Sequence, residues 1–295
     1  MESVKIKTAN YFYLLILVLL STAGGYVQLK NIFSGLIITE FGFILLPILV
    51  YLFAKRYDVK SILKIRRIKI SYILFAVIIA LVGWVVSEAI SVIWLFLAGR
   101  WIVVPPNPIP APENTRIFIE EIITVAFSAA VCEELFFRGF FMTAYERAGS
   151  RRAIVMSGIF FALLHMNPAS IPAIAFLGIL FAYSVYRTGS VFMSMIIHFV
   201  YNFMSVSIMK LAGGIEQQAT SIPLESAIAW LVLGVMAFLV LVKLLKKLDA
   251  VTKPEYKPAV GGTADFLRCS IGHWPIVLSI ILIFGQIVLL RVFKF

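Results

Sequence analysis

Three ionisable side chains lie within six residues of an otherwise apolar run, residues 122–142. Glu133, Glu134 and Arg138 interrupt a segment that is rich in Ile, Val, Ala and Phe. A charged group at membrane depth costs about 3 kcal/mol or more, and it normally faces the interior of a helix bundle or a wet cavity. The cluster therefore indicates a functional site, and a buried structural Glu–Arg pair is the alternative interpretation.

Helical geometry separates the two glutamates of this cluster. Glu134 and Arg138 are four residues apart, so on a helix they share a face and can form an ion pair. Glu133 is rotated by about 100° from Glu134, because one turn holds 3.6 residues. We expect Glu134 to pair with Arg138, which leaves the Glu133 carboxylate free to face water.

Two later segments carry histidines that could complete the same site. His165 stands four residues after Phe161, near the end of an apolar span, and His198 precedes Asn202 by one helical turn. Each is ambiguous alone, because polar pairs also join membrane helices. Counted from the basic flanks at 1.5 Å per residue, Glu133, His165 and His198 all lie roughly 12–20 Å from one side of the membrane. This common depth predicts that the three side chains meet.

A glutamate, two histidines and an amide suit hydrolysis. A general base takes the proton from water, and imidazole and amide donors can stabilise the oxyanion that forms. Glu with two His is also a zinc ligand set with an open fourth position, although the His-Glu-x-x-His motif is absent. Two mechanisms therefore stay open: water activated by a carboxylate alone, with no cofactor required, or by zinc bound to Glu133, His165 and His198.

The helices that must position these residues are membrane spans. Of the 295 residues, 61% are hydrophobic and 14% are charged, against about 25% charged in soluble domains. The composition predicts an all-α, polytopic membrane helix bundle with about eight or nine transmembrane helices. The predicted spans are 11–29, 32–54, 71–99, 117–142, 153–169, 171–187, 190–210, 226–245 and 275–291. We expect one membrane domain, 1–295, with the catalytic helices at about 117–205.

The net charge of +11 is concentrated between spans, which argues against nucleic-acid binding. Basic clusters at 55–69, 147–152 and 243–247 satisfy span parity if all three face the cytoplasm, where they would contact anionic headgroups. The Pro-rich segment 101–116 then faces the other side. Cys132 and Cys269 provide neither a disulfide framework nor a thiolate metal site.

Three more polar residues need an interpretation. Glu40 and Glu88 interrupt apolar spans, and each is expected either to form an interhelical hydrogen bond or to line the cavity. His273, which precedes the last span, is not expected to belong to the site.

The motifs Glu133-Glu134-x-x-x-Arg138, Phe161-x-x-x-His165 and His198-x-x-x-Asn202 resemble, in order and spacing, those of the CPBP family. This family comprises the type II CAAX prenyl endopeptidases and the bacteriocin-processing or self-immunity proteins, and the resemblance covers about 117–205.

The resemblance implies an all-helical intramembrane protease whose cavity opens to the cytoplasm. It implies that Glu133 is the base that activates water and that His165 helps to hold this water. His198 and Asn202 would stabilise the oxyanion, while Glu134 and Arg138 would support the site.

The leading hypothesis is thus a multi-pass endopeptidase in the plasma membrane of a prokaryote. Its expected partners are the lipid bilayer and a membrane-associated peptide or protein, of which prenylated CAAX proteins are one class. A non-enzymatic immunity or scaffold protein of the same fold is the alternative. A proton-coupled transporter is disfavoured, because the sequence shows no repeats or paired broken helices.

Overall fold

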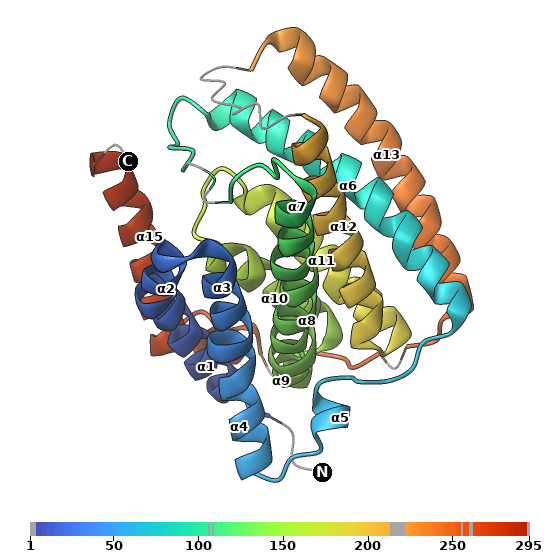
Figure 1. Cartoon of the computed structure of the whole chain (residues 1–295). Helices are drawn as coiled ribbons and strands as arrows, with labels where there is room; N and C mark the ends of the chain where they lie inside the picture. Colours follow the sequence, from blue (N-terminus) through green and yellow to red (C-terminus); the bar gives the residue numbers. More distant parts are fainter. Residues whose placement is uncertain are drawn as a thin grey trace.

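Long apolar runs form helices in this chain because a membrane offers the backbone no other hydrogen-bond partners. The computed structural model describes residues 4–105, 107, 109–212, 222–254, 256–259 and 262–293, and every regular element among them is a helix (Figure 1). The predicted all-α class is therefore confirmed. Pro106 and Pro108 of the Pro-rich segment lie outside the described residues.

The predicted number of spans is not confirmed. Within the described residues, six helices are long and apolar enough to cross a membrane: Ile6–Lys30, Ile32–Ala54, Ile70–Ala98 (α6), Ile171–Thr188 (α11), Val191–Leu211 (α12) and Leu224–Val251 (α13). A seventh span results if α14 (Thr263–Cys269) and α15 (Trp274–Phe293), which are bent by 65°, count as one. The chain is a multi-pass integral membrane protein with six or seven such helices.

Two predicted spans do not meet the criteria of length and composition for a membrane-spanning helix, each for a different physical reason. The helix α10 (Ser150–Leu164) has 15 residues, which is about 22 Å at 1.5 Å per residue and less than the ~30 Å hydrocarbon core. The helix through the first motif is long enough, but it carries several ionisable residues in every stretch of span length.

The first motif lies on a continuous helical run at the centre of the bundle. This motif helix consists of α7 (Thr115–Glu121), α8 (Ala129–Glu134) and α9 (Met142–Tyr145), joined by π-helical segments at Ile122–Ser128 and Leu135–Phe141. The Asn114 side chain caps its start by accepting a hydrogen bond from the Ile117 backbone N–H at 3.0 Å. π-Helical turns are rare and frequently occur at functional sites, and here they flank both glutamates.

The other motif helices pack around this run. The helix α12 contacts α8, α11 and α6, and α13 runs along α6 on the outside of the bundle (Figure 1). Between α10 and α11 the backbones touch, since a Cβ added at Gly178 would lie 2.7 Å from the Gly158 Cα. Small residues permit such close approach between membrane helices.

The N-terminal helices cover the opposite side of the motif helix. In α1 (Ile6–Leu19), Tyr13 is fully buried against a cluster of aromatic residues from the motif helix and α10. Asn10 of the same helix accepts a hydrogen bond from the Tyr145 hydroxyl at 2.7 Å, and its amide lies 3.2 Å from His273 Nδ1. His273 is therefore a buried side chain that links α1 to the turn before α15.

Candidate active site

The predicted ion pair forms at the core of the bundle. Arg138 Nη1 donates to Glu134 Oε1 at 2.8 Å, and both side chains are fully buried. Arg138 Nη2 donates to the Gly178 carbonyl at 3.0 Å, which is within reach because α11 packs so closely on α10. The guanidinium carbon also lies 4.3 Å from the centre of the Phe161 ring, a favourable cation–π distance. Phe161 of the second motif thus packs directly on the supporting pair.

His198 lies between the two motif glutamates. Its Nδ1 is 3.0 Å from Glu134 Oε1, and its Nε2 is 3.8 Å from Glu133 Oε2. A carboxylate paired with arginine accepts hydrogen bonds only, so Nδ1 must carry the proton that it donates to Glu134. This assignment leaves Nε2 as the ring atom that faces Glu133.

Glu133 is the more accessible of the two glutamates, as the helical geometry predicts. Its side chain is 13% exposed, whereas that of Glu134 is completely buried. The 3.8 Å separation from His198 is too long for a direct hydrogen bond. The Glu133 carboxylate therefore keeps free acceptor positions next to an imidazole.

A second acid borders Glu133 from the N-terminal helices. Glu40, in the π-helical segment Ile38–Leu45 that packs against α8, interacts electrostatically with Glu133. It is 7% exposed, and among the described residues its Oε2 has no hydrogen-bond partner. Of the two interpretations of Glu40, the structure favours a residue that lines the site. Glu88 lies elsewhere, beside Tyr201 of α12.

Asn202 connects α12 to the motif helix. Its Nδ2 donates to the Val125 carbonyl at 2.9 Å, in the first π-helical segment. The amide carries a second N–H donor. One donor of Asn202 thus holds the helices together, and the other has no partner among the described residues.

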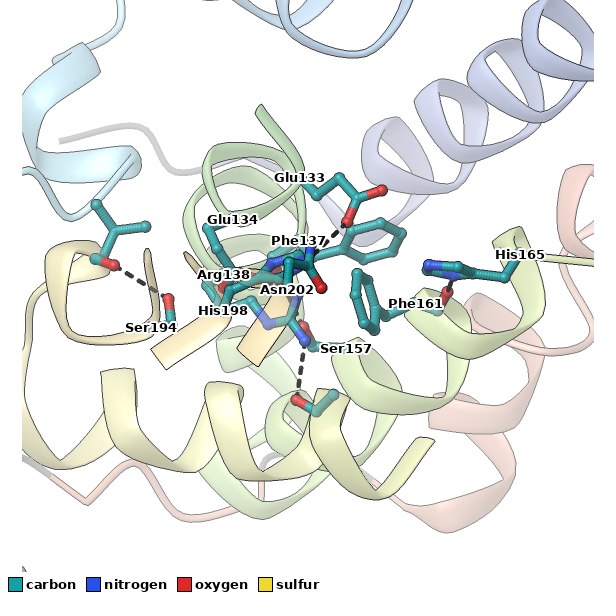
Figure 2. A network of polar contacts seen from close by, with 12 residues as sticks. Glu133, Glu134, Phe137, Arg138, Ser157, Phe161, His165, Ser194, His198 and Asn202 are labelled. Atoms are coloured by element: carbon teal, nitrogen blue, oxygen red, sulfur yellow. Dashed lines mark hydrogen bonds and ion pairs between the residues drawn. The ribbon is translucent and has the colours of Figure 1, made fainter. Parts of the chain in front are cut away.

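His165 stands apart from the other motif residues. It is exposed, its Nδ1 lies 2.8 Å from the Phe161 carbonyl oxygen, and its ring stacks edge-on against the Phe161 ring at 4.9 Å. Figure 2 shows its ring directed from its own backbone toward Phe161. The predicted convergence is thus seen for Glu133 and His198, whereas the contacts of His165 among the described residues are with Phe161.

The local sequence explains this position. The helix α10 ends at Leu164, and Met166 adopts a left-handed conformation with φ of 51°. Pro168 disfavours a helical conformation for Asn167. The helix therefore ends next to His165, so the depth counted along it holds, but depth alone does not say toward which neighbours the His165 ring turns.

The zinc ligand set does not fit this arrangement. Over the described part of the chain, no three His, Cys, Asp or Glu side chains are grouped so that they could hold a metal ion. Glu133 and His198 are neighbours, whereas His165 packs on Phe161. The centre of the Phe161 ring lies 4.9 Å from that of His165 and 5.9 Å from that of His198.

Two contributors to the site have no motif of their own. The Phe181 ring lies 5.1 Å from that of His198 and 5.2 Å from the Arg138 guanidinium, and the Gly178 carbonyl accepts from Arg138. Both come from α11. An aromatic residue and a glycine in an apolar span give no signal that distinguishes them from ordinary packing.

Fold and site together define a multi-pass integral membrane protein with a buried carboxylate–imidazole cluster. Within it, residues 115–204 match the family model "Type II CAAX prenyl endopeptidase Rce1-like", a family of proteases. The matched segment contains all three motifs, so the resemblance seen in the sequence is confirmed over these residues. No curated protein and no solved structure matches the chain.

Proposed function

We propose that this protein is an intramembrane endopeptidase in which Glu133 activates the attacking water. The observation that carries the proposal is the position of His198, 3.0 Å from Glu134 and 3.8 Å from Glu133. This geometry supplies a base, a fixed donor and a neutralised supporting carboxylate within one buried cluster. The match to a protease family over the same residues supports it.

The proposed reaction begins when the Glu133 carboxylate takes a proton from water. The oxygen of this water forms a bond to the scissile carbonyl carbon, and the carbonyl oxygen becomes an oxyanion. In this scheme both ring nitrogens of His198 carry a proton. Nδ1 keeps its hydrogen bond to Glu134, while Nε2 and the second N–H of Asn202 donate to the oxyanion. Glu133 then gives its proton to the leaving amine as the C–N bond breaks, which releases a carboxylate and an amine.

Arg138 and Glu134 have an orienting role in this scheme. Glu134 fixes the tautomer and the ring orientation of His198, and Arg138 keeps Glu134 ionised and anchors it to α11 through Gly178. Carboxylates that orient a functional histidine in this way strongly affect activity.

His165 is proposed to join the site when substrate binds. It is exposed and is held by a single side-chain hydrogen bond to the Phe161 carbonyl. Catalytic contacts are often incomplete without substrate. A rotation of the His165 side chain past Phe161 would let it help to hold the water.

We further propose that the substrate is a membrane-associated peptide or protein and that the site opens to the cytoplasm. Prenylated CAAX proteins are one candidate class, in keeping with the name of the matched family. The basic segments 55–69 and 147–152 lie in positions that the positive-inside rule assigns to the cytoplasm. We place the protein in the plasma membrane of a prokaryote.

The test is cleavage of a panel of prenylated and unprenylated peptides by the purified protein in detergent, with products mapped by mass spectrometry. The proposal predicts one defined cleavage position in at least one class, and cleavage that survives a metal chelator. If a chelator abolished cleavage and added Zn²⁺ restored it, the zinc mechanism would be supported instead. If every peptide stays intact while the protein is folded, endopeptidase activity is contradicted.

Among the described residues, His165 contacts Phe161 and is not grouped with Glu133 and His198, which favours the second candidate, a non-enzymatic immunity or scaffold protein. In that case the buried Glu134–Arg138 pair would serve only to hold helices together. A cellular phenotype that survives Glu133→Gln combined with His165→Ala would support this function and contradict the first.

A further inference from the structure

A cavity of about 520 Å³ lies at the end of the bundle where the basic segments gather. It forms where the loop after α5 (Val59–Ile62) meets the end of the motif helix, the end of α11 and a segment that contributes Lys253, Pro254 and Lys257. Backbone contacts fix the last of these segments in place. The Ser150 N–H donates to the Lys257 carbonyl at 2.9 Å, and the Lys257 N–H donates to Ser150 Oγ at 3.0 Å.

The charge lining this cavity is strongly positive. Among the described residues that line it, five cationic side chains face two acidic ones, which leaves an excess of three positive charges. The cationic residues are Lys64, Arg66, Arg187, Lys253 and Lys257, and the acidic residues are Asp58 and Glu146.

Within the described residues, three of the five cations pair with a carboxylate and two do not. Glu146 accepts from Lys64 at 2.8 Å and from Lys257 at 2.9 Å, so one carboxylate serves two cations. Within the described part of the chain, Arg66 and Lys253 have no carboxylate partner. Their side chains are exposed to solvent at the cavity.

Burial of Lys64 makes the binding of an anion in this cavity more favourable. The side chain of Lys64 is only 13% exposed, and burial lowers the pKa of this ammonium group although Glu146 acts to raise it. Lys64 Nζ also donates to the Arg138 carbonyl at 3.1 Å. An anion that entered the cavity would compensate a partly desolvated charge as well as the two free ones.

We propose that this cavity binds a phosphate group. Arginine offers a planar fork of donors to phosphate, and lysine offers a compact point charge. Ser61, whose hydroxyl group can donate a hydrogen bond, also lines the cavity. Two sources share this chemistry: the headgroup of an anionic lipid, or a soluble phosphate compound. The site is separate from the Glu133 cluster and does not depend on the proposed protease activity.

The test measures saturable stabilisation of the full-length protein in a neutral detergent, because a ligand that binds the folded state raises its unfolding temperature. One arm titrates inorganic phosphate against chloride at constant ionic strength. The other adds phosphatidylglycerol to the micelles, with phosphatidylcholine as the neutral comparison. Stabilisation in the lipid arm alone identifies a headgroup, and stabilisation in the phosphate arm alone identifies a soluble ligand.

The decisive variant combines Arg66→Gln with Lys253→Gln. Both side chains are exposed, so the fold should be kept. Its matched control, Lys246→Gln with Lys247→Gln, removes the same charge from exposed positions of α13 that do not line the cavity. Loss of two charge-assisted contacts should weaken binding about tenfold or more in the cavity variant, with little change in the control. Equal weakening in both variants, or no saturable stabilisation in either arm, would overturn the proposal.

Discussion

The Nδ1 atom of His198 lies 3.0 Å from Glu134 Oε1, the same oxygen that accepts the 2.8 Å hydrogen bond from Arg138. One carboxylate oxygen therefore orients the imidazole and neutralises the arginine at the same time. Because Glu134 and Arg138 are both fully buried, loss of either partner leaves an uncompensated charge in the core of the bundle.

The first prediction concerns this buried pair. Glu134→Leu alone should lower the free energy of unfolding by about 3–5 kcal/mol, because it leaves Arg138 unpaired. Combining it with Arg138→Met should restore most of the lost free energy of unfolding, since an apolar pair of similar size leaves no buried charge without a partner. Denaturant unfolding in detergent measures both. A single variant as stable as the wild type would show that the pair is not energetically coupled.

The second prediction separates the two buried histidines. His198→Ala should lower kcat of peptide cleavage by about 10²–10³-fold, the effect of removing one oxyanion donor. His273→Ala is the matched control, because this histidine is also buried but contacts Asn10 in the N-terminal helix. It should cost about 1–3 kcal/mol of stability and leave kcat nearly unchanged. The reverse pattern of kcat values would contradict the assignment of the site.

The third prediction tests the contact between α10 and α11. An added Cβ at Gly178 would lie 2.7 Å from the Gly158 Cα, so Gly178→Ala should destabilise the protein by about 1–3 kcal/mol. It should also reduce cleavage, because the carbonyl that binds Arg138 is displaced. Gly285→Ala in α15 serves as the control, since nothing lies within 4 Å of its added Cβ. Equal effects at the two positions would argue against a tight contact.

The fourth prediction is a pH dependence at the basic end of the bundle. Burial acts to raise the pKa of Glu146, but Lys64 and Lys257 outweigh it and hold this pKa below the ordinary value of 4.5. The unfolded chain then binds more protons below about pH 5, so the stabilisation is present above the ordinary pKa and is lost as pH falls through the folded one. Unfolding midpoints of the wild type should therefore decrease more between pH 5 and 3 than those of Glu146→Gln. Parallel curves would show that Glu146 is not stabilised by its lysines.

The sequence predicts the fold best where apolar runs have sharp polar ends. The predicted spans 32–54 and 71–99 agree with the observed Ile32–Ala54 and Ile70–Ala98 within one residue. It predicts the span number less well, because burial within the protein lets α10 be short and lets the motif helix be charged. The π-helical segments beside Glu133 and Glu134 leave no mark in residue type or spacing.

Some features of the candidate site can also be predicted from the sequence, and others cannot. The Glu134–Arg138 pair follows from a four-residue spacing on one helix, and the proximity of His198 follows from its depth. The contacts of His165 with Phe161 do not follow, because depth along a helix does not fix the direction in which a side chain points. The roles of Phe181 and Gly178 depend on which face α11 turns to the motif helix, and one sequence does not reveal this.

The most direct test of the central claim is the cleavage rate of Glu133→Gln, which keeps the shape of the side chain and removes the base. The control is Glu120→Gln, from the same helical run, whose wild-type carboxylate is 35% exposed and pairs only with Arg116 at 3.0 Å among the described residues. With both proteins equally stable, we expect kcat to fall by about 10²–10⁴-fold for Glu133→Gln and to stay within about twofold for Glu120→Gln. Full cleavage activity in Glu133→Gln would contradict the proposal that Glu133 activates the water.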